Sequence, residues 1–180
     1  MIIAAGLPQA PNLAEDREEV DLVCGKNLIH LLASGADEWN AFRGQHPGGV
    51  MLNRVCLADA QLANADLHLA FLLESNLQRA NLMSACLERA ILRNSNLRGS
   101  DLRYAKIDGA DLFAADLSGA DLRDASLAST FLKGADLRGA DLSTAHGLTA
   151  GQIVDAFGDH DTQLPENLDR PASWTAGGSG

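Results

Sequence analysis

Leucine recurs at every fifth position through the middle of the chain, from Leu52 to Leu142. Nineteen consecutive positions in this register hold eighteen Leu and one Ile, without a break. A second series of small residues, mostly Ala, runs two positions before them, from Ala60 to Ala145. A period of five fits neither an α-helix, which repeats every 3.6 residues, nor a flat strand, which repeats every two. The pattern predicts a chain that turns a corner every five residues, with one large and one small side chain inward on each side.

Four such sides close a square coil of twenty residues, so residues i and i+20 are expected to lie above one another. Coils stacked at about 4.8 Å pair through backbone hydrogen bonds, as parallel strands do. Nineteen repeats of five residues make nearly five coils. The large inward residues form the predicted core, which consists of Leu57, Leu62, Leu67, Leu72, Leu77, Leu82, Leu87, Leu92, Leu97, Leu102, Ile107, Leu112, Leu117, Leu122, Leu127, Leu132, Leu137 and Leu142.

The triplet Ala-Asp-Leu recurs at residues 110–112, 115–117 and 120–122. This motif resembles the pentapeptide-repeat family, and the resemblance covers about residues 50–146. It implies an all-β solenoid, a right-handed four-sided β-helix in which the Leu and the preceding small residue point inward. It implies no single activity, because the family ranges from topoisomerase-protecting DNA mimics to proteins of unknown role.

The two ends of the chain lack the five-residue pattern, and an open solenoid needs its apolar ends covered. We therefore expect short helical caps on both sides of the repeat domain. The expected segments are a flexible N-terminal stretch over 1–20, a helical cap over 21–49, the repeat β-helix over 50–146, a capping helix and tail over 147–174, and a flexible tail or expression-vector remnant over 175–180.

Local signals support helices in both caps. Leu28, Leu31 and Leu32 have helical spacing before Gly35, and Trp39 with Phe42 indicates a second short helix. After the repeats, a capping box predicts a helix start and a glycine predicts its end. The box is Thr149 with Gln152, the glycine is Gly158, and the expected buried face is Ile153, Val154 and Phe157.

The formal net charge of −10 is concentrated at the two ends of the chain. Residues 1–49 and 147–180 carry −4 each, whereas residues 50–146 carry only −2. Phosphate contacts need clustered Lys and Arg, so this distribution excludes non-specific nucleic-acid binding.

The sequence shows no catalytic, metal-binding or cofactor-binding motif. No two of the five His, and no His and Cys, lie five or twenty residues apart. No nucleophile elbow, P-loop or dinucleotide fingerprint is present. The three Cys form neither metal-ligand spacing nor an even disulfide set, which is typical of a reducing cytoplasm. We expect a cytoplasmic protein that is not an enzyme and has no signal peptide and no membrane span.

One side of the predicted coil is more apolar than the others. Its outward residues include Phe71, Leu73, Ile91, Phe113 and Phe131. Exposed apolar patches usually mark contacts, so this side predicts an interface with a protein partner or with a second copy of the chain. The alternative is that the C-terminal helix or tail covers this side with Phe157 or Trp174.

Two functions remain open from the sequence. The first is a rigid protein–protein interaction module or scaffold. The second, implied by the family resemblance, is a DNA mimic that binds DNA gyrase or topoisomerase IV. Mimicry needs columns of carboxylates, and the candidates are Asp101, Asp121 and Asp141 on one side and Asp116 and Asp136 on another. The near-neutral repeat region, the Arg residues on the same sides and the lack of loop insertions count against it.

Overall fold

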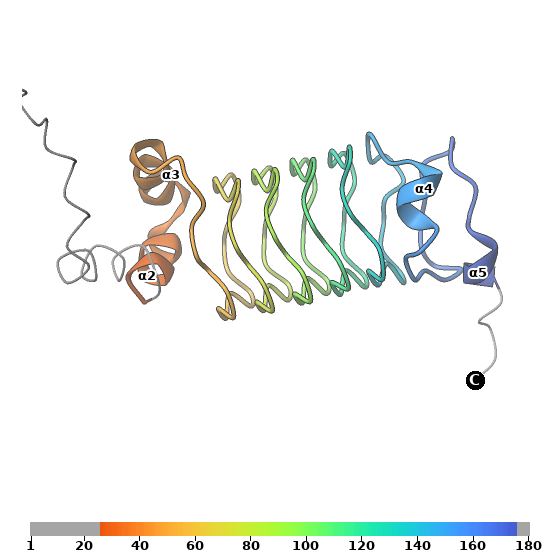
Figure 1. Cartoon of the computed structure of the whole chain (residues 1–180), viewed down its shortest axis with the longest axis horizontal. Helices are drawn as coiled ribbons and strands as arrows, with labels where there is room; N and C mark the ends of the chain where they lie inside the picture. The colour runs from red at the N-terminus through yellow and green to blue at the C-terminus, as the bar shows by residue number, and fades with distance from the viewer. Residues whose placement is uncertain (1–25, 176–180) are drawn as a thin grey trace, which may run out of the picture.

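The computed structural model describes residues 26–175, of which residues 51–146 form a four-sided coil (Figure 1). Backbone bridges join residues twenty positions apart, for example Met51 with Phe71 and Phe71 with Ile91. At each bridge the later residue both donates and accepts a backbone hydrogen bond: Ile91 N donates to Ala70 O at 2.9 Å, and Ile91 O accepts from Leu72 N at 2.8 Å. Within residues 26–175 the bridges stay isolated and form no longer strands, because the chain turns again after every side.

From Leu57 to Ala145, each corner is a tight turn closed by a hydrogen bond from the small inward residue to the preceding large one. At one corner Ala60 N donates to Leu57 O at 3.2 Å, and Asp59 between them has φ 60°. A positive φ at this place is the feature of a type II turn, and glycine adopts it without steric cost. This explains why Gly recurs two residues after the Leu, as at Gly99 with φ 62°.

The interior of the coil is filled by the two inward series. All eighteen predicted core residues are buried, and the most exposed of them, Leu57, is only 5% exposed. Where a hydroxyl replaces the small Ala, it usually finds a backbone acceptor: Ser75 Oγ donates to Leu52 O at 2.8 Å and Thr130 Oγ1 to Ile107 O at 2.9 Å. These bonds cancel the cost of placing a polar group among leucines.

Two helices lie at the N-terminal end of the coil, α2 (Lys26–Ser34) and α3 (Ala36–Gln45) (Figure 1). Leu28 and Leu32 of α2 are each 1% exposed, and Trp39 of α3 is fully buried. Gly35 joins the helices with φ 131°, a conformation that L side chains rarely adopt. The predicted flexible segment over 1–20, and the first residues of the predicted cap, lie outside the described residues.

Helix α3 contacts the beginning of the coil through side chains that bond its backbone. Trp39 Nε1 donates to Asp66 O at 2.7 Å, and Asn40 Oδ1 accepts from Asp66 N at 2.8 Å. Asn40 Nδ2 also donates to Asn64 O at 3.0 Å. Asp66 has no preceding coil to pair with, so α3 supplies the hydrogen-bond partners that its backbone lacks at this edge.

Arg43 completes this contact, although no sequence pattern pointed to it. Its Nη1 donates to His46 O and Gly48 O at 2.6 Å each, and its Nη2 donates to His68 O at 2.9 Å. Arg43 is only 1% exposed, and burial lowers the pKa of its guanidinium. His68 Nδ1 lies 3.1 Å from Arg43 Nη2 and 2.6 Å from Asp66 Oδ1. His68 Nδ1 cannot accept a hydrogen bond from Arg43 Nη2 and donate one to Asp66 Oδ1 at the same time. Because Nη2 already has the His68 carbonyl as its acceptor, we assign the Nδ1 proton to the bond with Asp66.

The C-terminal helix differs from the prediction. The capping box between Thr149 and Gln152 forms, but α4 (Ala150–Ile153) ends well before Gly158. Ile153 is buried as expected, whereas Val154 is 56% exposed and Phe157 is 62% exposed, so their placement on a buried helical face was wrong. The cause is competition from the coil, which the chain rejoins after α4.

Residues 156–164 resume the bridged pattern of the repeats. Phe157 N donates to Ala135 O at 2.8 Å and Leu137 N donates to Phe157 O at 2.7 Å, so Phe157 stacks on Asp136. Gln163 stacks on Asp141 in the same way. The sequence hides this because α4 and a loop break the five-residue spacing before and between these bridges.

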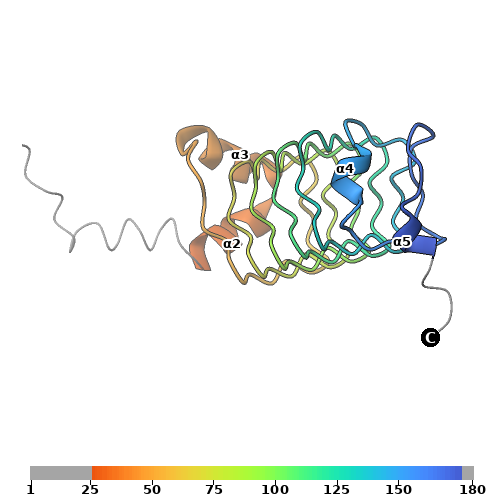
Figure 2. The ribbon, with the colours of Figure 1, turned by 45° about the vertical axis from the view of Figure 1, so that its right-hand side comes forward.

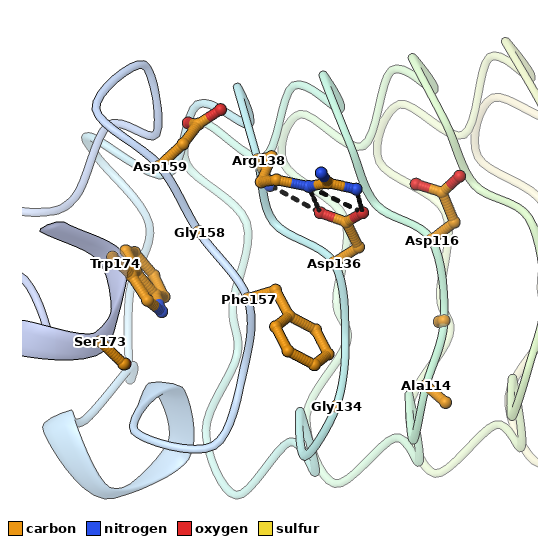
Figure 3. A pocket seen from close by; sticks show the side chains of 11 residues that line it. Ala114, Asp116, Gly134, Asp136, Arg138, Phe157, Gly158, Asp159, Ser173 and Trp174 are labelled. Carbon is orange, nitrogen blue, oxygen red and sulfur yellow. Dashed lines mark hydrogen bonds and ion pairs between the residues drawn. The ribbon is translucent and has the colours of Figure 1, made fainter. Parts of the chain in front are cut away.

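The last described element, α5 (Ala172–Thr175), closes this end of the coil (Figures 2 and 3). Gly158 occupies the inward place that Leu holds in the repeats, and the Trp174 ring packs directly on it. A Cβ at Gly158 would lie 2.3 Å from Trp174 Cε3, so only glycine leaves room for the ring. Trp174 Nε1 donates to Ala156 O at 2.8 Å. Trp174 therefore covers the end of the coil and does not lie over the side that carries Phe71.

Candidate interaction surface

One side of the coil is defined by the bridged column Met51, Phe71, Ile91, Asp111 and Phe131. We call it the apolar side. The residues two positions after this column also point outward, because the Leu between them points into the core. They are Asn53, Leu73, Arg93, Phe113 and Lys133.

The structure brings all five predicted apolar residues together on this side. Phe71 and Phe113 are each 36% exposed and Phe131 is 45% exposed, whereas Leu73 and Ile91 are half-buried. Met51, at 41% exposure, extends the surface; the sequence reasoning missed it although it shares the twenty-residue register with Phe71. Within residues 26–175, no helix or tail segment removes the three phenylalanines from solvent.

Aromatic and charged groups on the apolar side pack against one another. The rings of Phe113 and Phe131 are stacked with centroids 6.3 Å apart, and the guanidinium of Arg93 lies 5.5 Å from the Phe113 centroid. Arg93 Nε also donates to Asp111 Oδ2 at 2.6 Å. Such contacts hold large side chains in place before binding, so less side-chain entropy is lost when a partner covers them.

The first carboxylate column forms a ladder in which acids and arginines alternate. Asp101, Asp121 and Asp141 stack as predicted, and Arg103 pairs with Asp101 at 2.7 Å while approaching Asp121 at 3.7 Å. Arg123 repeats this one coil later, at 2.6 Å from Asp121 and 3.6 Å from Asp141. A side-chain hydrogen bond from the neighbouring Arg lowers the pKa of both Asp101 and Asp121. These acids are therefore ionised and locally neutralised.

The second column is neutralised in part. Asp136 forms an ion pair with Arg138, and the Arg138 side-chain hydrogen bond lowers the pKa of Asp136. Asp116 Oδ1 accepts from Ser118 N at 2.9 Å, the two-residue turn contact that also occurs at Asp101, Asp111, Asp121 and Asp136. The recurrence of Asp follows from this turn chemistry, because each carboxylate accepts from a corner amide.

A hollow of about 560 Å³ lies beside the second column, where the coil meets the C-terminal segment (Figure 3). Its walls include Phe157 and Trp174 on one side and Asp116, Asp136 and Arg138 on the other. Arg138 is already paired with Asp136 across the wall. Arg138 is the one basic residue in the lining, and the other polar lining residues are Asp116, Asp159 and Ser173. The hollow therefore offers a ligand no unpaired basic group, and we take the apolar side as the stronger candidate for binding.

The residues that the structure describes contain no candidate metal site. No group of three or more His, Cys, Asp or Glu among residues 26–175 is placed to hold a metal ion. Cys56 and Cys86 are free thiols, and Cys24 lies outside the described residues. In the same range no helix has the length and apolarity needed to cross a membrane.

Comparison with known proteins identifies the family. The model for pentapeptide repeats matches in eight copies, over residues 56–94, 87–119 and 108–143. A pentapeptide repeat protein of solved structure from Nostoc PCC 7120 is 34% identical over 79% of this chain and 86% of its own, with a TM-score of 0.32. The chain belongs to the pentapeptide-repeat family, whose members are right-handed four-sided β-helices.

Two further solved structures have lower sequence identity to the chain. HetL, a pentapeptide repeat protein involved in heterocyst differentiation regulation from Nostoc sp. strain PCC 7120, is 30% identical over 64% of this chain, with a TM-score of 0.30. The chain spans 58% of the length of HetL. QnrB1, a plasmid-mediated fluoroquinolone resistance protein, is 17% identical over 67% of this chain and 81% of its own, with a TM-score of 0.40. No curated protein sequence matches the chain.

Proposed function

We propose that this protein is a non-enzymatic interaction module of the cytoplasm, a rigid scaffold that binds a partner protein through its apolar side. The observation that carries the proposal is the exposure of Phe71, Phe113 and Phe131 on one side of the coil. When an aromatic side chain is buried against a partner, each Å² of apolar surface removed from water contributes about 25 cal/mol of favourable free energy. Three such side chains on a flat, regular surface favour binding to another protein.

The proposal includes a role for the two ends. Helices α2 and α3 and the segment from α4 to α5 act as caps, and residues 50–146 act as the repeat domain between them. The bonds from Trp39 and Asn40 to the first coil, and the packing of Trp174 on Gly158, support this division. Capped ends block end-to-end growth through exposed backbone groups, so binding is directed to the sides of the coil.

Replacing Phe71, Phe113 and Phe131 together with Ser is expected to abolish partner binding and leave the fold intact, because all three rings point outward. The matched control is Tyr104→Ser, which removes a ring that is 56% exposed on a different side. Each immobilised variant is incubated with cell extract, the retained proteins are identified by mass spectrometry, and each is purified and tested for direct binding. Equal binding by the wild type and the triple variant would contradict the proposal.

The alternative function is a DNA mimic that binds a type II topoisomerase, with Asp101, Asp121, Asp141, Asp116 and Asp136 as its phosphate-like groups. A mimic must present a largely unneutralised row of negative charge. The alternating ion pairs of Arg103 and Arg123 with the first column weaken this alternative.

Titrating the purified protein into a DNA gyrase supercoiling assay, with and without a fluoroquinolone, tests the alternative. On the proposed function we expect no inhibition and no protection from drug-induced cleavage, even at a large molar excess. Inhibition or protection that is lost in an Asp116→Asn/Asp136→Asn variant would make mimicry the better explanation.

A further inference from the structure

The apolar side, together with the turn that follows it in each coil, carries one charged residue at each of six successive levels, and the sign alternates from level to level. The levels are the five bridged layers of the apolar side and the residues just after α4, which follow these layers in the same direction. In order, the charged residues are Arg54, Glu74, Arg93, Asp111, Lys133 and Asp155. Gly134 N donates to Asp155 O at 2.8 Å, which places Asp155 directly after the level of Lys133.

Within one chain these charges form three ion pairs between neighbouring levels. The distances are 2.8 Å for Arg54–Glu74, 2.6 Å for Arg93–Asp111 and 3.7 Å for Lys133–Asp155. The side chains remain accessible: that of Arg54 is 74% exposed, and those of Lys133 and Asp155 are 59% exposed each. They can therefore contact charges of a second molecule that lies on the same side.

An alternating row of six charges is complementary to itself when a copy is turned end for end. We number the levels from one, which carries Arg54, to six, which carries Asp155. Consider a two-fold axis that lies in the interface, perpendicular to the long axis of the coil and between the levels of Arg93 and Asp111. It places level one of one copy opposite level six of the other. Arg54 then lies opposite the partner's Asp155, Glu74 opposite the partner's Lys133, and Arg93 opposite the partner's Asp111. Every level meets a level of opposite sign.

Other symmetric arrangements do not have this property. In a parallel pair each level faces its own copy, so like charges lie opposite one another at all six levels. An antiparallel pair centred on a level, instead of between two levels, also matches like with like. Because like charges held opposite one another are strongly unfavourable, the charge order restricts the axis to a place between two neighbouring levels. Only the axis between the levels of Arg93 and Asp111 pairs all six levels.

The apolar residues agree with this register. Phe71, at the second level, lies opposite the partner's Phe131 at the fifth, so two exposed rings are buried together. Phe113, at the fourth level, lies opposite the level of the partner's Ile91 and Arg93. Arg93 already lies over Phe113 within one chain, so the same cation–ring contact is available across the axis.

We propose that the apolar side binds a second copy of this chain, as an antiparallel homodimer whose two-fold axis lies between the levels of Arg93 and Asp111. The inference rests on the proposed function and names its partner. The contact surface is short, because six levels at about 4.8 Å span roughly 24 Å. Stable complexes typically bury roughly 1,200–2,000 Å², and for a surface this short we expect a smaller area and a dissociation constant in the micromolar range.

Charge reversal tests both the partner and the register. The full-length chain and its variants are studied by sedimentation equilibrium from about 10 to 500 µM, a range that brackets micromolar affinity. Glu74→Lys makes both facing levels positive, and Lys133→Glu makes both negative. Each single variant is expected to raise the dissociation constant roughly tenfold or more, because it places like charges opposite one another twice per dimer. The double variant Glu74→Lys/Lys133→Glu restores opposite signs and is expected to dimerise nearly as well as the wild type.

The double variant distinguishes a lost contact across the interface from a disturbance within one chain. It carries both intramolecular disturbances, since it breaks the pairing of Glu74 with Arg54 and of Lys133 with Asp155, yet only a cross-axis contact lets it recover. A double variant that associates no better than the singles overturns the register, and so does a single variant that dimerises like the wild type.

A wild-type chain that stays monomeric up to 500 µM overturns the homodimer. The proposed function then survives if the extract experiment finds a different protein that needs Phe71, Phe113 and Phe131. A wild-type dimer that the triple Ser variant forms equally well overturns the apolar side as the contact surface and removes support from both proposals.

Discussion

Replacing Leu97 with Ala is expected to lower the free energy of unfolding by about 2–5 kcal/mol, as for other fully buried leucines. Leu97 is 1% exposed and lies in the middle of the coil, with stacked coils on both sides. Truncation loses the transfer free energy of the missing carbons and leaves a cavity. Because each coil contacts only its neighbours, little of the structure is free to collapse into that cavity. Urea denaturation followed by circular dichroism measures the change.

The matched control for this prediction is Arg98→Ala, one residue away in the same turn. Arg98 is exposed, so its truncation should leave the free energy of unfolding almost unchanged. Leu102→Ala, on the next side of the same coil, is expected to resemble Leu97→Ala. Similar losses at Leu97 and Arg98 would mean that the large residue of the repeat does not point inward.

The repeat could be predicted from the sequence because its information is local and redundant. The five-residue period identifies the inward residues and, through the twenty-residue register, the residues that stack on each side. Phe71 and Phe131 are sixty positions apart, yet both fall on the apolar side for this reason. A single outward residue does not by itself indicate an apolar surface. Its place in the twenty-residue register shows which other outward residues lie next to it on the same side.

The ends could not be predicted to the same depth, because their contacts are neither periodic nor local. Phe157 looked like part of a helix, but its backbone gains bridge partners in the coil and its side chain stays outside. Gly158 looked like a helix stop, and its actual role depends on Trp174, sixteen residues later. Only a three-dimensional structure shows that a glycine occupies a leucine position because a distant tryptophan ring covers it.

Arg43 is the clearest example of a contact that no pattern reveals. It lies in a short helix of mixed composition, and two of its acceptors follow within five residues. The third, His68 O, belongs to the first full coil, twenty-five positions away. A single guanidinium therefore joins α3, the loop after it and the coil, a geometry that the planar fork of Arg provides and Lys does not.

Replacing Arg43 with Met is expected to free α3 from the coil. The substitution keeps much of the apolar stem but removes the donor from the carbonyls of His46, Gly48 and His68, which lie in a partly buried place. A hydrogen bond from a charged donor contributes about 1.5–3 kcal/mol, and water can replace part of what is lost here, so we expect the free energy of opening α3 to fall by about 2–3 kcal/mol. Native-state hydrogen exchange of the amides of residues 36–45 measures this change directly.

The effect should be local, in contrast to that of Leu97→Ala. Contacts in a solenoid are between neighbours, so amides near Leu122 and Leu142 should keep their protection when Arg43 is replaced. Arg79→Met is the matched control: Arg79 makes two hydrogen bonds to Asp59 at 2.7 Å but is exposed, so its loss should change exchange little. If Arg43→Met exchanges like Arg79→Met, the guanidinium does not hold α3. If protection falls along the whole coil, α3 is part of one cooperative unit with the repeats, and the cap is needed for the coil to fold at all.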